Sequence, residues 1–223
     1  MVHRPYKGKQ IMNKKQTCAK IVEILKNQYP DALCSLQYSD PIQLIIAVRL
    51  SAQCTDARVN MVTPGLFAAL PDVDAFCNSD ISEIEKHIQS CGLYRTKAKD
   101  IKNMFLMIRD EFGGKLPDNM DDLLRLPGVG RKTANLIMGD VYGQPAIVAD
   151  THCIRISGRL GLTDSKDPYK VEMQLRKIIE PSEGSDFCHR IVLFGRDICS
   201  ARAPKCDICP LSELCPTYKK QKD

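Results

Sequence analysis

The stretch Leu126-Pro127-Gly128-Val129-Gly130-Arg131-Lys132-Thr133-Ala134 stands near the middle of the chain and reads as a tight turn entering a helix. Its two glycines permit backbone conformations closed to other residues and leave backbone N–H groups bare for a close partner. The following helix directs the positive end of its dipole at that partner, so an anion such as a phosphate fits there. Lys132 lies one turn from this end, and a carboxylate follows in Val148-Ala149-Asp150-Thr151-His152. Phosphate cradle, amine and carboxylate together indicate chemistry on a nucleic acid.

The composition is that of an ordinary globular protein. The 223 residues are 43% hydrophobic and 26% charged, so the chain can bury a substantial core in one large domain or two small ones. A net charge of +5 favours a polyanionic partner without establishing one. No stretch approaches the roughly twenty apolar residues of a membrane span, and the polar segment 1–15 is no secretory signal. We therefore expect no membrane association and a cytoplasmic, nucleoid-associated location.

Apolar residues recur at three- and four-residue steps along nearly the whole chain, which predicts helices joined by short loops. There is no sustained alternation of period two, so we expect no strands beyond isolated bridges. The predicted fold is therefore all-α. The periodic segments are 18–29, 41–50, 81–88, 98–112, 120–126, 131–142, 150–159, 168–179 and 187–195.

Four cysteines gather near the C-terminus, spaced C-x6-C-x2-C-x5-C. They are Cys199, Cys206, Cys209 and Cys215. In a reducing compartment they do not form a disulfide framework, and four thiolates this close in sequence predict a metal site. Zinc sites usually pair two C-x2-C knuckles, whereas only one is present here, so an iron–sulfur cluster is preferred and zinc is the alternative. The loop between the first two cysteines carries Arg202 and Lys205, which suit a phosphate but also an ordinary solvated loop.

Taken together, these motifs resemble the endonuclease III family, bacterial DNA glycosylases and abasic-site lyases of the helix-hairpin-helix superfamily. The matching motifs, in the family's order, are 50–56, 92–94, 126–134, 148–152 and the four cysteines. The resemblance implies a two-lobed fold, with a six-helix lobe over residues 34–144 that carries the hairpin. Residues 1–33 and 145–223 would form a second lobe, which holds a [4Fe–4S] cluster on the four cysteines. The implied partner is double-stranded DNA with a damaged base or an abasic site, engaged by a monomer.

The resemblance makes Lys132 the nucleophile. A lysine amine is protonated at neutral pH, but the helix dipole, the neighbouring Arg131 and partial burial would each favour its neutral form. The amine could then attack the sugar C1′ of a flipped nucleotide, expel the base and, as a Schiff base, allow β-elimination. A solvated lysine on a first helical turn is the alternative. Oxidised, ring-saturated pyrimidines are the implied substrates.

Asp150 has two compatible roles. It stands at a predicted helix start, where a carboxylate is a good N-cap that contributes about 1 kcal/mol. The resemblance assigns it catalysis, stabilising the cationic sugar as the base departs and assisting proton transfer. A capping carboxylate stays ionised and fixed in direction, which suits electrostatic stabilisation.

The hairpin is expected to contact the DNA backbone. Gly128 and Gly130 would donate backbone N–H groups to a phosphate, Val129 would anchor the turn in the core, and Arg131 would lie beside the phosphate. Such contacts position a strand without reading its sequence. A plain helix–turn–helix connection is the alternative.

Gln53 and Leu93 match the family's wedge residues, which fill the space left by a flipped nucleotide. Gln53 could otherwise cap a helix, and Leu93 could belong to the core. Asp56 and His152 match positions near the pocket, where buried hydrogen-bonding roles are the alternative. Cys54 departs from the small apolar residue that related enzymes often carry, and an exposed thiol there could be oxidised.

Two other functions fit parts of this pattern. A monofunctional mispair glycosylase of the same superfamily generally lacks a lysine at the position of Lys132. A non-catalytic iron–sulfur DNA-binding protein would need neither Lys132 nor Asp150. The bifunctional glycosylase and lyase is therefore the preferred interpretation.

Overall fold

The structure, a computed structural model, describes residues 12–222. Over this range the chain forms twelve α-helices and three short 3-10 helices, with no strand, which confirms the all-α prediction. Within the same range no helix combines the length and apolar character needed to cross a membrane. Residues 1–11 and 223, which the second lobe was predicted to include, lie outside the described residues.

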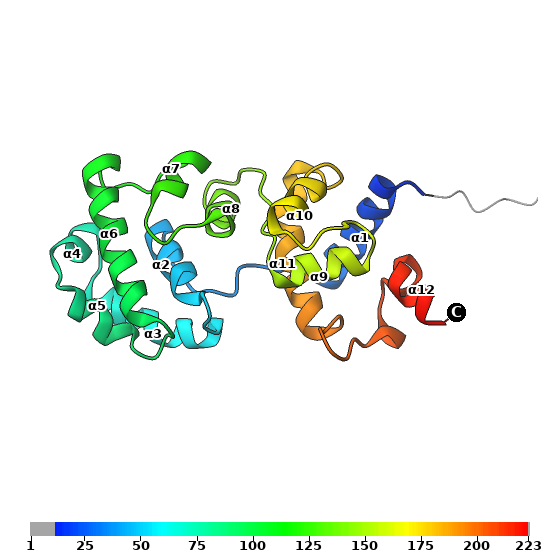
Figure 1. Ribbon diagram of the computed structural model, residues 1–223, viewed down its shortest axis with the longest axis horizontal. Helices are drawn as coiled ribbons and strands as arrows, with labels where there is room; N and C mark the ends of the chain where they lie inside the picture. Colours follow the sequence, from blue (N-terminus) through cyan, green and yellow to red (C-terminus); the bar gives the residue numbers. More distant parts are fainter. Residues whose placement is uncertain (1–11, 223) are drawn as a thin grey trace, which may run out of the picture.

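Residues 34–144 contain seven helices, one more than the six expected, because a six-residue segment before α5 is also helical. They are α2 (Pro41–Ser51), α3 (Asp56–Ala69), α4 (Val73–Asn78), α5 (Ile81–Ile88), α6 (Tyr94–Phe112), α7 (Met120–Arg125) and α8 (Arg131–Asp140). The almost wholly apolar α2 contacts α3, α6 and α8 and lies among them (Figure 1). Its burial follows from its sequence, since an apolar run without a polar face is stable only inside the molecule.

Hydrophobic periodicity did not predict α3 and α4. The helix α3 contains Pro64, which lacks an N–H group, and its apolar residues do not form one stripe. The helix α4 is too short for a periodic signal. Both begin at side-chain caps, where Thr55 accepts a hydrogen bond from the Arg58 N–H at 3.3 Å and Asp72 accepts one from the Ala75 N–H at 2.8 Å. Local capping therefore determines where these helices start.

The remaining helices gather at the other end of the molecule. They are α1 (Lys14–Gln28), α9 (Thr151–Arg159), α10 (Pro168–Leu175), α11 (Gly184–Asp197) and α12 (Pro216–Lys222), with 3-10 turns at Pro181–Glu183, Cys206–Ile208 and Ser212–Leu214. The helix α11 contacts α1 and α9, so the first described helix packs against the C-terminal part of the chain (Figure 1).

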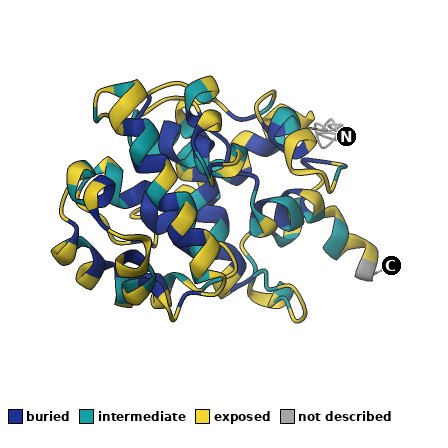
Figure 2. Ribbon diagram, turned by 60° about the vertical axis from the view of Figure 1, so that its left-hand side comes forward, coloured by how far each residue is buried: buried dark blue, intermediate teal, exposed yellow. Residues whose placement is uncertain are grey.

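The buried apolar residues form two clusters, as the inward faces of the helices show (Figure 2). One cluster lies within residues 36–146, and the other combines residues 18–25 with residues 147–211. Leu136 of α8 packs against both. On this basis we propose the division into a lobe over residues 34–144 and a discontinuous lobe formed by residues 1–33 and 145–223.

A buried carboxylate joins the two lobes. The Glu172 side chain on α10 is 3% exposed and accepts hydrogen bonds from Arg131 of α8, at 2.7 Å from Nε and 2.9 Å from Nη2. Glu172 also accepts one from Arg176 Nε at 3.0 Å, and Arg176 Nη2 donates to Asn135 Oδ1 at 2.9 Å. Two guanidinium groups therefore hold the start of α8 against α10.

Replacing Glu172 by Gln should lower the free energy of unfolding by about 2 kcal/mol, because both guanidinium groups lose their charged acceptor. Urea denaturation measures the change. The matched control is Glu180→Gln, which removes an ion pair with Lys15 in which both side chains are more than 60% exposed. Exposed pairs contribute little, so this control should unfold like the native protein. Equal losses in the two variants would show that Glu172 does not join the lobes.

Candidate active site and DNA interface

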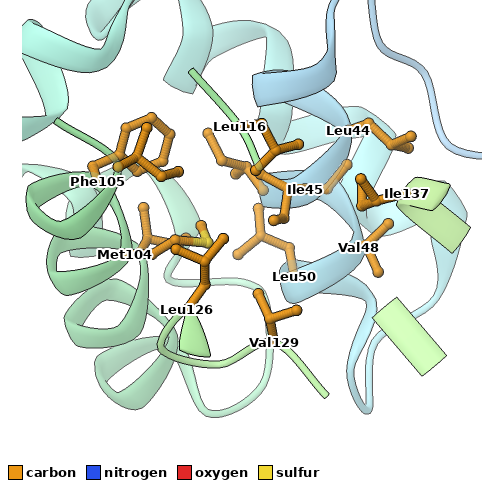
Figure 3. Packing of buried hydrophobic residues seen from close by; sticks show 14 of the residues in the cluster. Leu44, Ile45, Val48, Leu50, Met104, Phe105, Leu116, Leu126, Val129 and Ile137 are labelled. Carbon is orange, nitrogen blue, oxygen red and sulfur yellow. The ribbon is translucent and has the colours of Figure 1, made fainter. Parts of the chain in front are cut away.

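Val129 anchors the hairpin between α7 and α8 in the hydrophobic core. It is 8% exposed and lies near Leu126 and Leu50 (Figure 3). Its N–H donates to the Leu126 carbonyl oxygen at 3.0 Å, which closes the turn. Gly128 and Gly130 on either side are exposed, so the turn presents its glycine backbone to solvent while its one side chain points inward.

Position 128 requires glycine for two reasons, its backbone conformation and the atoms that surround it. Its φ of +78° lies in the left-handed region, which L side chains rarely adopt. A Cβ atom here would lie 2.6 Å from Arg49 Nε and 3.0 Å from the Asp100 Cβ. Arg49 cannot easily move away, because it donates to Asp100 Oδ2 at 3.0 Å from Nε and 2.5 Å from Nη2. The hairpin therefore packs directly against an ion pair.

The helix α8 begins without a side-chain cap, since its N-cap residue is Gly130. The N–H groups of a helix's first turn lack intrahelical acceptors, so they can bind an anion at the positive end of the helix dipole. The Arg131 side chain, predicted to lie beside a DNA phosphate, instead binds Glu172 and stacks 4.7 Å from the centre of the Tyr169 ring. What Arg131 offers to an anion here is its backbone N–H.

Lys132 is exposed, not partly buried as expected. The charge of Arg131, which was expected to act on the Lys132 amine, is balanced by Glu172. The start of α8 is open to solvent, which leaves Lys132 exposed. The Arg131 side chain joins the lobes by binding Glu172. Of the three features predicted to favour a neutral amine, the structure contains the positive helix end.

Lys132 and Asp150 line one cavity of about 270 Å³, to which residues of both lobes contribute. Lys132 comes from α8, Asp150 and His152 from the start of α9, Asp56 from the start of α3 and Arg196 from α11. The volume lies just below the range of about 300–1,000 Å³ typical of small-molecule sites. The cavity therefore suits one small ring system.

Asp150 is the N-cap of α9, as predicted, and its Oδ1 accepts a hydrogen bond from the Cys153 N–H at 2.7 Å. The next residue but one, His152, lies with Nδ1 3.2 Å from Arg155 Nη2. Burial lowers the pKa of His152, the Asp150 carboxylate opposes this, and the charges of Arg155, Arg196 and Lys132 lower it further. His152 is therefore a neutral imidazole at neutral pH.

Asp56 connects the lobes beside the cavity. It accepts hydrogen bonds from Ser35 Oγ at 2.5 Å and from Arg196 Nη2 at 2.8 Å. Burial alone would raise the pKa of Asp56, but these hydrogen bonds and the charges of Arg196 and Lys132 bring it below its usual value. Asp56 is therefore ionised within electrostatic range of Lys132. The sequence analysis missed Ser35 and Arg196, which stand in no motif; the one available signal was that a carboxylate near a pocket requires a cationic partner.

Gln53 and Leu93 share an unusual backbone conformation. In the described part of the chain they are the non-glycine residues with positive φ, at 54° and 59°. Leu93 is also 58% exposed despite its apolar side chain. Their loops are in contact, since a Cβ on Gly92 would lie 3.5 Å from the Gln53 carbonyl oxygen. Backbone strain of this kind is concentrated at functional sites, and the two predicted wedge residues both lie on strained loops that are in contact.

The four C-terminal cysteines surround one cavity of about 180 Å³, and none forms a disulfide. Among residues 12–222, no group of three His, Cys, Asp or Glu side chains is placed to hold a single metal ion. Four thiols that line one cavity supply the donor set that an iron–sulfur cluster needs.

Arg159 of α9 shapes the loop between the first two cysteines. Its Nη1 donates to Cys199 Sγ at 3.3 Å and to the Ser200 carbonyl oxygen at 2.7 Å, and its Nη2 donates to the Ala201 carbonyl oxygen at 2.8 Å. Arg202 on this loop is exposed and lines the cysteine cavity. The sequence analysis missed Arg159, because a basic residue in the last turn of a helix has an ordinary explanation in the helix dipole.

Comparisons with known proteins show which family this chain is similar to. A family model described as HhH-GPD superfamily base excision DNA repair protein matches residues 46–181, and one described as iron-sulfur binding domain of endonuclease III matches residues 199–215. Endonuclease III of Synechocystis sp. is 46% identical, over 94% of this chain and 96% of the relative. The chain belongs to the endonuclease III family. Endonuclease III of Bacillus subtilis is 43% identical over 87% of this chain and 90% of the relative.

A solved structure of a trapped endonuclease III–DNA covalent intermediate superimposes with a TM-score of 0.89 at 42% identity, covering 95% of this chain and 100% of that one. A thermostable thymine-DNA glycosylase shares the fold, with a TM-score of 0.82 at 24% identity, covering 92% of this chain and 97% of that one. As a member of the endonuclease III family, the protein is a DNA glycosylase and lyase of base excision repair that carries a [4Fe–4S] cluster.

Gly128→Ala should lower the free energy of unfolding by more than Gly143→Ala. Both positions have left-handed backbones, with φ of +78° and +60°, which cost about 1–2 kcal/mol with a side chain. A Cβ on Gly143 would meet no atom within 4 Å, whereas one on Gly128 would clash with Arg49. The clash adds about 1–3 kcal/mol, measurable by urea denaturation. Equal losses would mean that Arg49 yields to the new methyl group.

Proposed function

We propose that this endonuclease III family member removes an oxidised pyrimidine from double-stranded DNA and then cleaves the strand 3′ to the abasic site, with Lys132 as nucleophile. The observation that carries the proposal is the convergence of Lys132, Asp150 and Asp56 on one cavity of about 270 Å³ between the lobes. The covalent intermediate named for the structural relative supports a covalent step on this fold. We also propose that the protein acts as a monomer at the nucleoid in the cytoplasm, where that substrate lies.

In the first step, the neutral Lys132 amine attacks the sugar C1′. The N–C1′ bond forms as the glycosidic bond breaks, and the bonding electron pair leaves with the base, which takes up a proton. Positive charge develops on the sugar, and the fixed carboxylate of Asp150 stabilises it. Asp56, kept ionised by Ser35 and Arg196, supplies a second negative charge. A nucleotide seated in the cavity would cover Lys132 and provide the desolvation that the free protein lacks.

In the second step, ring opening gives a Schiff base between Lys132 and C1′. The protonated imine makes the C2′ proton acidic, and its loss expels the 3′ phosphate by breaking the C3′–O bond. Hydrolysis of the imine then returns the Lys132 amine. One lysine therefore serves both base release and strand cleavage.

The surfaces around the cavity fit the path of a DNA strand. The uncapped N–H groups at Gly130 and the start of α8 would bind one phosphate, and Arg202 and Lys205 would contact another part of the backbone. Gln53 and Leu93 would fill the gap left by the flipped nucleotide. The [4Fe–4S] cluster, held by the four cysteines, would crosslink the C-terminal segment and fix the loop of Arg202.

Borohydride trapping on a duplex containing thymine glycol tests the nucleophile. The native protein should form a covalent protein–DNA adduct, because borohydride reduces the Schiff base, and Lys132→Ala should form none. Gel electrophoresis detects the adduct. An adduct that survives the substitution would assign the amine elsewhere, and base release without any adduct would make the enzyme monofunctional.

Asp150→Asn separates the capping role of Asp150 from its proposed catalytic role. Asn is as good an N-cap as Asp, so the variant should fold like the native protein. Loss of the negative charge should slow base release by about 10²-fold. Normal turnover in this variant would limit Asp150 to its capping role.

Leu93→Ala should weaken binding to a duplex with a tetrahydrofuran abasic analogue by about tenfold, because the unstacked gap loses roughly 1.4 kcal/mol of apolar contact. Fluorescence anisotropy measures the affinity. Ile81→Ala, which truncates another exposed apolar residue on α5, is the matched control and should bind like the native protein. Equal affinities of Leu93→Ala and the native protein would contradict the wedge assignment.

A further inference from the structure

His189 of α11 lines the same cavity as Lys132 and Asp150, and the proposed reaction gives it no role. Its Nε2 lies 2.9 Å from Oδ1 of Asp140, which is the last residue of α8 in the other lobe. The same oxygen accepts a hydrogen bond from Ser185 Oγ at 2.7 Å. A contact between the lobes therefore fixes the orientation of a ring in the cavity wall.

Neither burial nor helix position favours a carboxylate at Asp140. Its side chain is 7% exposed, and its Oδ2 is buried without a hydrogen-bond partner. Burying an unpaired polar atom costs free energy. Asp140 also ends α8, where the negative end of the helix dipole disfavours an anion. The hydrogen bonds to Ser185 and His189 are what this position provides.

The two histidines that line the cavity present opposite hydrogen-bonding atoms. A carboxylate can only accept, so Asp140 places the proton of a neutral His189 ring on Nε2 and leaves a lone pair on Nδ1. In His152, Nδ1 lies 3.2 Å from Arg155 Nη2, which can only donate, so Nδ1 accepts and Nε2 carries the proton. His189 is therefore the histidine with an unused acceptor.

This acceptor is accessible. Within residues 12–222, His189 Nδ1 has no hydrogen-bond partner, and it is not among the buried side-chain atoms that lack one. An unpaired nitrogen that is not buried, on a side chain that lines the cavity, can be reached by a molecule in that cavity.

We propose that His189 contacts the flipped base and that its Nδ1 accepts a hydrogen bond from an N–H or O–H donor of that base. Asp140 is the positioning residue that keeps the His189 proton on Nε2. The inference rests on the proposed function, because it concerns recognition of the base that leaves. His189 acts on base release and not on β-elimination, since the base has departed before that step.

Ring-saturated pyrimidines offer two kinds of donor to such an acceptor. Thymine glycol and dihydrothymine both carry the imide N3–H, whereas the hydroxyl groups on C5 and C6 occur only in thymine glycol. A site that hydrogen-bonds one of these groups discriminates against a base without it. Comparing the two lesions therefore identifies the donor.

The test compares His189→Gln with the native protein on duplexes that contain thymine glycol, dihydrothymine or a preformed abasic site. Gln is the matched replacement, because its amide nitrogen can donate to Asp140 in place of Nε2 while nothing replaces Nδ1. Base release from thymine glycol should fall by about tenfold, the effect of one hydrogen bond. Cleavage of the abasic duplex should proceed at the native rate. Single-turnover kinetics on denaturing gels measures both.

Loss on both lesions would assign N3–H as the donor, and loss on thymine glycol alone would assign a hydroxyl group. No loss on thymine glycol overturns the proposal. An equal loss on the abasic duplex also overturns it, because His189 would then only join the lobes. His87→Gln on α5, which does not line the cavity, is the control and should match the native protein on every duplex.

The native protein separates this inference from the function on which it rests. If the native protein cleaves none of the three duplexes, the proposed function fails and the role of His189 fails with it. If the native protein is active and His189→Gln is equally active on thymine glycol, the role of His189 fails alone.

Asp140 is tested by a conservative and a disruptive replacement. Asp140→Asn should keep release of thymine glycol within about twofold of the native rate, because its amide oxygen still accepts from Nε2. Asp140→Ala removes this acceptor and should behave like His189→Gln. The ratio of thymine glycol release to abasic cleavage corrects for any loss of folded protein. An unchanged ratio in Asp140→Ala would contradict the positioning role, and a reduced ratio in Asp140→Asn would contradict the tautomer assignment.

Discussion

The buried carboxylate of Glu172 is the interaction on which the arrangement of the site depends. An ionised side chain that is 3% exposed is stable only with charged partners, and here Arg131 and Arg176 supply them. Because Arg131 is the first residue of α8, the same contact fixes where the helix begins relative to the second lobe. Lys132, one residue further on, is directed into the cavity as a consequence. The position of Lys132, the proposed nucleophile, thus follows from the ion pair between Arg131 and Glu172.

A second ion pair, between two residues that line the cavity, also joins the lobes. Arg196 of α11 reaches across to Asp56 at the start of α3 and, with Ser35, keeps that carboxylate ionised. The two lobes have separate hydrophobic cores, so apolar packing does little to fix the orientation of one lobe relative to the other. Ion pairs between the lobes help to fix that orientation. Orientation matters more than strength here, because the amine and the carboxylates must meet around one small group.

The strained loops of Gln53 and Leu93 differ from the hairpin in how they treat an apolar side chain. Val129 secures the hairpin by burying its side chain, whereas Leu93 leaves an apolar side chain in water on a left-handed backbone. An arrangement that lowers the stability of the free protein is retained where a partner covers it.

The all-α fold, the N-cap role of Asp150, the core position of Val129 and the gathering of four cysteines could be predicted from the sequence, because capping, periodicity and spacing are local properties. The sequence did not predict α3 or α4, where Pro64 and short length obscure the periodic signal. It predicted partial burial of Lys132, which is exposed, and gave no sign that the Arg131 side chain binds Glu172. These features depend on tertiary contacts, since Glu172, Arg196 and Ser35 are distant in the chain from their partners and stand in no motif. Contacts between the lobes depend on which distant side chains the fold brings together, and no local sequence pattern contains that information.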